Sequence, residues 1–505
     1  MQSSEQITSD IPKNSLKFSA AIRTELGNPY DLQIETLLNG KVTLIYLHSI
    51  INKNELQDHL LTALHHPALV EQSLTIISWN DLLPYISERG RRERKRMSEI
   101  FQDLLSGRVL IHLTGSGIIY SFNAQASAKR QPTDANTERA IRAPRITFIE
   151  NLDENLSILR AGIKDLALRV EHFVVGRRTQ TDVVLVYLAD VTDPEVVREA
   201  RRRLKAIDID GIIDSGYIDQ LVTDNRRSLF PLIQDTERPD KVKAAILEGR
   251  VALLVNGSTK ALLIPTTVNE LYQSPDDYLH NIGIGSFLRF FRILGNNIAV
   301  ALPGLYIAVT GVNHSMLPVQ FTLSVAGSRM NVAAPLVVEI VLMDIIVEVF
   351  REASLRLPSP VSQTLGVTTG IVLGTAAVQA GIVSNATLVV VMITAIASFS
   401  GPNFSIGFTW RILRFGLIFI ATLFGLYGLT IGGLIILGNA AMQTSFGIPF
   451  LSPWAPVRFK SLMDTIIRRP LWMEKRLQIY QPVDRKRFYD PDEAPTAKEP
   501  NEHEK

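Results

Sequence analysis

Three long stretches of the sequence contain no Asp, Glu, Lys or Arg, and they constrain the fold more than any other feature. They are Ile293–Ser328, Leu357–Trp410 and Phe415–Val457. A soluble fold covers its surface with charged side chains, so uncharged stretches of this length need a solvent other than water. We therefore predict an integral membrane protein with a helical membrane domain over residues 285–457. Whole-chain averages conceal this, because a net charge of +2 and 46% hydrophobic residues are ordinary values for a soluble protein.

Basic residues flank the uncharged stretches on both sides. Arg289 and Arg292 lie just before the first stretch, and the segment after the last one includes Arg458, Lys460 and Arg468. The positive-inside rule places both flanks, and therefore both termini, in the cytoplasm. The number of crossings must then be even, from four to six. We expect residues 458–505 to form a basic cytoplasmic tail with a disordered end.

Two segments decide the number of crossings. Pro335–Phe350 is apolar but carries acidic residues, so it either crosses, which gives six crossings, or lies in the interface, which gives four. We favour six elements, at least two of them short or re-entrant. Ile412–Ala441 is either one long tilted helix or a hairpin broken around Gly425–Gly433. The preceding Arg411 and Arg414 favour the hairpin.

The first half of the chain contains an internal repeat. KVTLIYL at Lys41–Leu47 resembles DVVLVYL at Asp182–Leu188, and LLSGRVLIHLTGS at Leu104–Ser116 resembles ILEGRVALLVNGS at Ile246–Ser258. The second pair predicts a helix ending at a glycine, a strand, and a glycine-containing turn into another strand. After a polar N-terminal tail at 1–34, we predict two related α/β subdomains at 35–130 and 145–275. The fold class is thus a cytoplasmic α/β region of two related subdomains, followed by an all-α polytopic membrane domain.

Signatures of enzymes are missing from the sequence. It contains no GxxxxGK[ST], GxSxG or HExxH pattern, and it contains no cysteine. The histidines are scattered, and the adjacent pair His65–His66 precedes a proline, which is typical of a loop. We therefore predict a protein that is not an enzyme, holds no cofactor or metal, and does not bind nucleic acid.

Acidic residues inside the apolar segment form the first candidate site: Glu339, Asp344, Glu348 and Glu352. The last three are spaced i, i+4, i+8, so they share one face of a helix. Acidic side chains at membrane depth are costly and rarely face lipid. They either form a cation path or attraction site, or they belong to an interfacial helix, in water or paired with Arg351 or Arg356. The sequence leaves both interpretations open.

The segment Val361–Val383 carries two further patterns. Small residues at Gly366, Gly370 and Gly374 permit close helix packing. Polar residues recur at intervals of three, four or seven and would lie along one side of a helix. Packing is the conservative interpretation, and a polar stripe lining a water-filled pore in an oligomer is the functional one. The candidates for the pore lining are Thr364, Thr368, Thr375 and Gln379.

Several motifs resemble one known family in order and spacing. The most specific stretch is Phe350–Ser400, with FREASLRLPSP, GTAAVQAGIVS and VVVMITAIASFS. SLFPLIQDTERPD at Ser228–Asp240, PDDY at Pro275–Tyr278 and LSPWAP at Leu451–Pro456 match as well. From about residue 40 to 470 the chain resembles the A subunit of the GerA family of bacterial spore germinant receptors. Departures from the family pattern, such as Met330 after Arg329, mark a divergent member.

This resemblance implies a function and partners. The A subunit of such a receptor works in the spore inner membrane with a transporter-like B subunit and a lipoprotein C subunit. Nutrient binding is attributed chiefly to the B subunit, and the A subunit is expected to form a homo-oligomer that acts as a nutrient-gated channel for monovalent cations. Membrane lipid is a further partner. The alternatives are a membrane-anchored scaffold that conducts no ions, and a secondary transporter.

Overall fold

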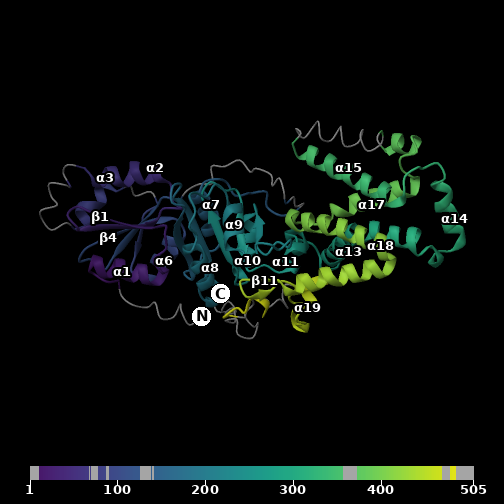
Figure 1. Ribbon diagram of the computed structural model, residues 1–505. Coiled ribbons are helices and arrows are strands. Elements are labelled where there is room, and N and C mark those ends of the chain that lie inside the picture. The colour runs from purple at the N-terminus through teal and green to yellow at the C-terminus, as the bar shows by residue number, and fades with distance from the viewer. Residues whose placement is uncertain are drawn as a thin grey trace, which may run out of the picture.

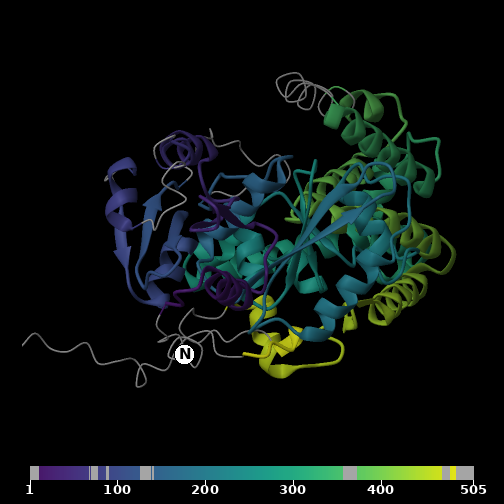
Figure 2. The same ribbon diagram turned by 90° about the vertical axis from the view of Figure 1, so that its left-hand side faces the viewer.

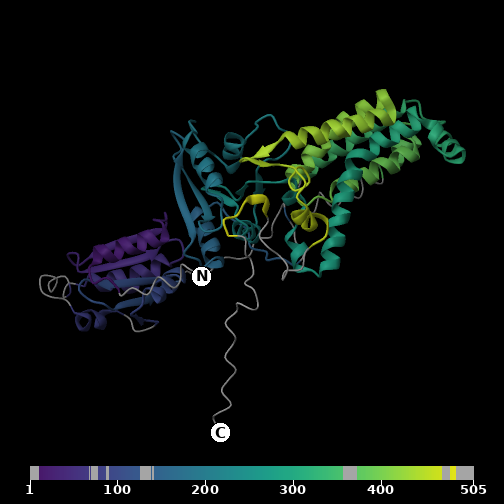
Figure 3. The same ribbon diagram turned by 90° about the horizontal axis from the view of Figure 1, so that it is seen from below.

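Two α/β units and a helical domain follow one another along the long axis of the molecule (Figure 1). The computed structural model describes residues 11–66, 69, 78–86, 90–125, 138, 142–356, 372, 374–468 and 478–484. Seen from below, the first unit lies beyond the second, away from the helices (Figure 3). The second unit therefore connects the first unit to the helical domain.

The first unit is an antiparallel five-stranded sheet with helices on both faces. Its strand order is β1-β2-β4-β5-β3. One face packs on α1 and α6, and the other packs on short helices that follow β2. The bounds are α1 Ser15–Leu26, β1 Leu32–Leu37, β2 Val42–Leu47, α2 Lys53–Leu56, η1 Gln57–Leu61, α3 Thr62–Leu64, α5 Trp79–Leu82, η2 Leu83–Tyr85, β3 Arg92–Arg94, α6 Met97–Leu105, β4 Arg108–Leu113 and β5 Ile119–Asn123.

The second unit repeats this plan, with the strand order β6-β7-β9-β10-β8. Helices α7 and α10 cover one face, and α8 and α9 cover the other. The bounds are α7 Leu152–Gly162, β6 Leu168–Val175, β7 Thr181–Leu188, α8 Pro194–Lys205, α9 Ser215–Val222, β8 Gln234–Thr236, α10 Pro239–Leu247, β9 Val251–Val255 and β10 Ala261–Ile264. The identical strand order shows that the two units are related, as the sequence repeat predicts.

Equivalent positions in the two units make equivalent contacts. Gly107 after α6 and Gly249 after α10 have φ of +80° and +91°, the left-handed conformation that glycine adopts at a helix C-terminus. In both sheets the tyrosine of the repeated strand donates to a glutamate on the neighbouring edge strand, and the Tyr187 hydroxyl lies 2.6 Å from Glu171. An α/β region of two related units followed by a helical region confirms the predicted fold class.

The N-terminal tail expected at residues 1–34 differs from the structure. Residues 15–26 form α1, whose N-terminus is capped by the Asn14 side chain, and β1 begins at Leu32. Phe18, Ile22 and Leu26 are buried against the sheet. Their spacing of four residues places them on one helix face, which the polar residues between them conceal in an average over the segment. Helix α1 thus corresponds to α7 of the second unit.

A buried ion pair joins the two units. Arg160 of α7 donates to both carboxylate oxygens of Asp31, at 2.9 and 2.7 Å, and both residues are almost inaccessible. Ser49 donates to the same carboxylate at 2.6 Å. The three donors to the Asp31 carboxylate help to offset the cost of burying the charged pair. The contact therefore restricts the orientation of the first unit relative to the second.

The helical domain begins after two short helices, α11 (Val268–Tyr272) and α12 (Pro275–Leu279). Helix α13 (Ile282–Ile307) continues into η3 (Ala308–Val312), and α14 (Val319–Ser328) and α15 (Leu336–Arg356) follow. Residues 374–379 are helical, and α17 (Asn385–Ser398) precedes α18 (Phe404–Met442). Among the described helices, the continuous segment Ile282–Val312 and α18 are long and apolar enough to cross a membrane.

Helix α18 is a hairpin rather than one straight helix. Its direction reverses at Gly425, where φ is 59° and ψ is −136°. The Asn313 side chain accepts the Leu426 amide at 3.0 Å and so replaces a helical hydrogen bond that the break removes. Gly428 and Gly432 then pack closely against the first arm, because a Cβ at either position would clash with it. The structure thus contains the hairpin that the flanking arginines favour.

The C-terminal part returns to the second unit. The short strands β11 (Thr444–Ser445) and β12 (Ile448–Pro449) and helix α19 (Phe459–Ile466) lie beside it, where the yellow ribbon runs in Figure 2. The Val483 amide donates to the Val191 carbonyl at 2.8 Å. Residues 458–468 and 478–484 of the predicted basic tail thus pack on the second unit, and the end expected to be disordered lies outside the described residues. Buried side chains such as Asp464 and Tyr480 hold these segments in place.

The packing of α1 yields a direct test. Replacing Ile22 by Ala should destabilise the first unit by about 2–5 kcal/mol, because the buried side chain leaves a cavity. The change is measured by heating the full chain and monitoring its unfolding by the rate at which a protease cleaves the first unit. Leu16→Ala on the same helix is the control, since Leu16 is 80% exposed and its loss should change little. Equal effects of the two substitutions would contradict the packing of α1.

Candidate functional site at the junction of the second unit and the helical domain

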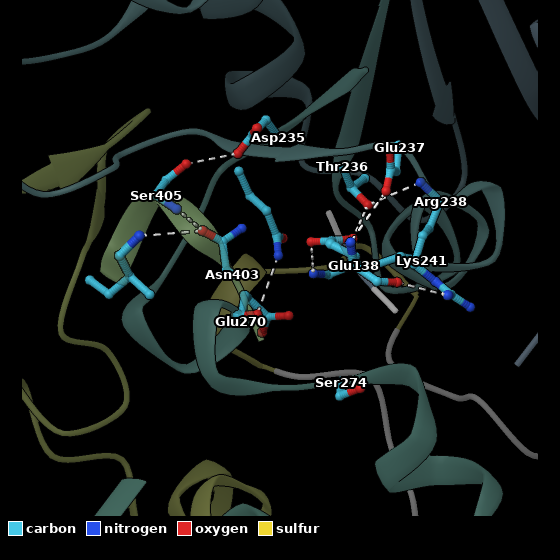
Figure 4. Close-up of polar contacts among 12 residues, drawn as sticks. Glu138, Asp235, Thr236, Glu237, Arg238, Lys241, Glu270, Ser274, Asn403 and Ser405 are labelled. Carbon is cyan, nitrogen blue, oxygen red and sulfur yellow. Dashed lines mark hydrogen bonds and ion pairs between the residues drawn. The ribbon is translucent and has the colours of Figure 1, made fainter. Parts of the chain in front are cut away.

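The edge strand β8 and the two residues after it carry several buried polar side chains. Gln234, Thr236, Glu237 and Arg238 are all buried, and they belong to the motif SLFPLIQDTERPD. Buried polar groups are stable only when they find hydrogen-bond partners. Those partners come from two directions, the connection between the α/β units and the start of α18 (Figure 4).

On one side, β8 and α10 hold Glu138, which lies in the connection between the two units. Its carboxylate accepts from the Thr236 hydroxyl at 2.5 Å and from Lys241 Nζ at 2.9 Å. Arg238 donates to the carbonyls of Glu138 and Pro144, at 3.1 and 3.3 Å, and is held by its own ion pair with Asp240 at 2.7 Å. These contacts fix the connection between the units against the edge of the second sheet.

On the other side, Asp235 contacts the helical domain. Its carboxylate accepts from the Ser405 hydroxyl at 3.1 Å and from Lys260 Nζ at 2.6 Å. Ser405 lies in the first turn of α18, which Asn403 caps. Burial raises the pKa of Asp235, but Lys260 and Ser405 together outweigh that effect and leave the pKa below its ordinary value. Asp235 is therefore ionised and holds the start of α18.

A second carboxylate nearby behaves in the opposite way. Burial, and after it the charge of Asp235, raises the pKa of Asp219 on α9 to about 7. Asp219 and Ser405 line the same cavity between the second unit and α18. Near neutral pH, loss of the Asp219 proton would add a like charge beside the contact between Asp235 and Ser405.

The base of α13 is fixed by the second family motif, PDDY. Asp277 is fully buried and accepts from Arg292 at 2.9 and 3.0 Å and from Arg289 at 3.3 Å. Arg289 also pairs with Asp464 at 3.6 Å, and the Tyr278 hydroxyl donates to Asp464 at 3.2 Å. Carboxylates thus join α12, α13 and the segment that includes α19.

The acidic candidates on α15 each lie against an arginine. Glu339 accepts from Arg329 at 3.0 Å, and its second oxygen accepts the Ser384 amide and the Thr387 hydroxyl at the start of α17. Asp344 Oδ2 lies 3.2 Å from Arg414 Nε, in a geometry that makes an ion pair without a hydrogen bond. These two acids are sealed inside the helical domain.

The other two acidic candidates are more accessible. Glu348 contacts Arg411 of α18 and lies 3.5 Å from Arg351, and Glu352 pairs with Arg356 at 2.5 Å. All four acids are thus paired, two of them with Arg411 and Arg414 in the first arm of the α18 hairpin. The structure brings together acidic residues of α15 and basic residues that the sequence analysis used only as topology signals.

The candidate pore stripe is only partly described. Thr375 and Gln379 are exposed, and the Thr375 hydroxyl donates to the Val372 carbonyl at 3.2 Å. Gly374 is buried and faces Leu388 of α17, which fits a packing role. The remaining candidates lie outside the described residues: Thr364, Gly366, Thr368 and Gly370.

Metal binding finds no support in the described part of the chain, where no three His, Asp or Glu side chains converge as ligands. The buried polar contacts of β8 and Asp277 were not predicted from the sequence as a site. The sequence signal that could have found them is the resemblance to the family, because β8 lies in the motif SLFPLIQDTERPD and Asp277 lies in the motif PDDY.

Taken together, these features define an α/β region that is tied by buried charges to a domain of apolar helices. The chain matches the family model described as Bacillus/Clostridium GerA spore germination protein over residues 20–479. It is 34% identical over 470 residues to "Spore germination protein GerLA" of Bacillus cereus, which covers 92% of this chain and 95% of that protein. The chain therefore belongs to the GerA family of spore germination proteins.

Further relatives agree with this assignment. "Spore germination protein B1" of Bacillus subtilis (strain 168) is 35% identical over 475 residues, which cover 93% of this chain and 97% of that protein. The crystal structure of the N-terminal domain of the A subunit of the Bacillus megaterium spore germinant receptor GerK3 is 30% identical, with a TM-score of 0.39. It covers 51% of this chain and 96% of that chain. The two relatives named spore germination proteins and the apolar helices indicate a membrane-associated germination protein.

The Asp277 cluster provides a test of the junction. Asp277→Asn should destabilise the protein by about 3–5 kcal/mol, because it leaves Arg289 and Arg292 buried without their counter-charge. Thermal unfolding of the detergent-solubilised full chain measures this. Asp208→Asn is the matched control, since the pair of Asp208 with Arg177 is exposed to solvent and its loss should change the unfolding temperature little. An Asp277 variant as stable as the control would contradict the importance of the cluster.

Proposed function

We propose that this chain is the A subunit of a nutrient germinant receptor in the spore inner membrane, and that several copies enclose a gated path for monovalent cations. The observation that carries the proposal is the family match, which spans both α/β units and the helical domain. The relatives that match over nearly their whole length are named spore germination proteins. The similarity to these proteins therefore extends over the α/β units and the helical domain together, and not over a single motif.

The proposed assembly includes a transporter-like B subunit, a lipoprotein C subunit and further copies of this chain. Large apolar side chains on the helical domain support an assembly in lipid, because so many exposed hydrophobic groups need lipid or other subunits to cover them. Helix α14 is the extreme case, since none of its residues is buried. No catalytic step is part of this proposal.

The proposed topology has six crossings and both termini in the cytoplasm. The direction of the described helices supports it. Helix α13 runs from the Asp277 cluster at the second unit to Asn313 at the tip of the α18 hairpin. Helix α17 begins beside Glu339 and ends where Ser400 contacts the Arg292 carbonyl at 3.4 Å. Arg289 and Arg292 of α13 lie at the end nearest the α/β units, as the positive-inside rule requires of a cytoplasmic side.

The proposed cation path follows the polar stripe. Hydroxyl and amide groups at Thr375 and Gln379, with Thr364 and Thr368, would replace part of the hydration shell of an ion. The accessible acids Glu348 and Glu352 would attract cations toward the path, although their arginine partners weaken that attraction. Nutrient binding at a partner subunit would favour the open state through its higher affinity for that state.

A scaffold is the second candidate function. The specific observation in its favour is the pairing of every acid on α15 with an arginine. In a scaffold these ion pairs would serve only to hold α15 against its neighbours. A scaffold should keep its function when an acid on α15 and its arginine partner are both replaced by apolar residues, whereas a cation path that uses these charges should not.

The polar stripe yields one prediction. Thr375→Leu and Gln379→Leu should each reduce germinant-triggered potassium release from spores by roughly tenfold, since removing a polar pore group raises the barrier for a dehydrated ion by the energy of about one charged hydrogen bond. Release is measured with a potassium electrode at matched protein level.

Thr430→Leu is the matched control for Thr375→Leu. Thr430 is also exposed, and its hydroxyl donates to the carbonyl three residues earlier at 2.9 Å. The control should release potassium normally. Normal release from both stripe variants would remove the stripe from the path.

The buried pair of Asp344 and Arg414 yields another prediction. Asp344→Leu or Arg414→Leu alone should lower the amount of folded protein, because each leaves an uncompensated buried charge that costs about 3–5 kcal/mol. The double variant should recover the folded protein. If the recovered double variant still releases potassium, the pair is structural; if it is folded but releases none, the charges belong to the path.

A further inference from the structure

A cavity of about 270 Å³ lies beside β8, between α10, α11 and α12. It is separate from the polar stripe and from the cavity between the second unit and α18 that Asp219 and Ser405 line. Its walls include the apolar side chains of Pro144, Ala245, Pro275 and Leu279. This volume is slightly below the usual range for small-molecule sites, so an occupant would be small.

The basic side chains on the cavity wall already have partners. Lys241 is held by Glu138 at 2.9 Å. The three guanidinium nitrogens of Arg250 donate to the Pro265 carbonyl, the Gln234 side chain and the Thr266 hydroxyl, at 2.8, 3.0 and 3.1 Å. Neither cation is therefore available to a ligand without breaking these bonds.

The carboxylate of Glu270 differs from these groups. Glu270 is 7% exposed and lines the cavity, and its Oε1 atom receives no hydrogen bond from any described residue. Its other oxygen lies 3.6 Å from Arg250 Nη1, outside hydrogen-bond distance. Burial, and after it the charge of Glu270, raises the pKa of the Tyr480 hydroxyl, which lies near this carboxylate without the geometry of a regular hydrogen bond. A buried carboxylate oxygen without a donor is costly, and an occupant that donates to it would remove that cost.

We propose that this cavity binds a small organic cation with an N–H donor, such as a primary ammonium on a short apolar chain, and that Glu270 accepts its hydrogen bond. An N–H donor with a positive charge complements the buried Glu270 carboxylate, whereas an anion would be repelled by it. Glu270, Lys241 and Ser274 of this wall are labelled in Figure 4. The apolar walls take the chain of the ligand.

Contacts of the cavity wall connect the proposed binding site to the helical domain. Gln273 on its wall donates to the Asp464 carbonyl at 3.5 Å, and Tyr278 on the same wall donates to the Asp464 carboxylate. Asp464 in turn pairs with Arg289 of α13. The binding of a cation here is independent of whether the chain conducts ions, so the two proposals fail or succeed separately.

Binding is tested on the purified full chain in nanodiscs with n-propylammonium chloride as the probe, by calorimetry or ligand-observed NMR. We expect saturable binding that is at least tenfold tighter than that of 1-propanol, which lacks the charge, and of tetramethylammonium, which lacks the donor. Glu270→Gln should weaken the binding by about tenfold or more, the usual effect of losing a charged hydrogen bond. Glu195→Gln, at an exposed pair on α8, should leave it unchanged.

A second variant covers the case in which Glu270→Gln does not fold. Ala244 is exposed at the cavity wall, so Ala244→Phe should block the cavity without disturbing the core. It should abolish binding while thermal unfolding stays as in the unmodified chain. The proposal is overturned if the unmodified chain shows no saturable binding, or if a folded Glu270→Gln or Ala244→Phe variant binds the probe normally.

Discussion

One fully buried carboxylate, that of Asp277, determines how the α/β region meets the helices. It accepts the Ser274 amide that begins α12, and it binds Arg289 and Arg292 of α13. The cost of burying one carboxylate is offset only if both arginines keep their positions. The direction of α13 is therefore set at its first turns. The α18 hairpin packs along α13 as far as the tip of the hairpin, where the Leu426 amide contacts Asn313.

The duplicated unit uses its edge strand in two different ways. In the first unit, the edge strand β3 carries Arg92 and Glu93 toward solvent, which protects an open sheet edge against pairing with other chains. In the second unit, the equivalent strand β8 is covered by the connection at Glu138 and by the start of α18. Its polar side chains remain polar because they bind these neighbours. The same sheet thus ends in solvent in one copy and in a domain junction in the other.

The sequence predicts local features of this fold well. The repeated strands and the glycines after α6 and α10 follow from short-range patterns, because a buried strand and a left-handed glycine depend on a few adjacent residues. Helix α1 was missed because its apolar face is narrow and the apolar Leu16 lies on its exposed side, which weakens the helical pattern. The spacing of four residues between Phe18, Ile22 and Leu26 is the signal that could have found it.

Contacts between distant segments could not be read from the sequence. Arg351 and Arg356 were the expected partners of the α15 acids because they are close in the chain. The actual partners of Asp344 and Glu348 include Arg414 and Arg411, which lie in another helix. The polar residues of β8 likewise look like a loop until Ser405 is placed beside them. A long-range partner is a property of the packed helices, so residue spacing carries no information about it.

Both ends of the α18 hairpin are attached to the second unit, which limits how the two domains can move. Ser405 binds Asp235 at one end, and at the other end the Thr266 amide donates to Ser445 at 2.9 Å and the Val268 amide donates to the Phe450 carbonyl at 2.8 Å. Because both arms of the hairpin are attached, one arm cannot rotate against the second unit unless the other arm moves with it. A displacement of the second unit would therefore move both arms of the hairpin together, with the non-helical backbone of Gly425 between them.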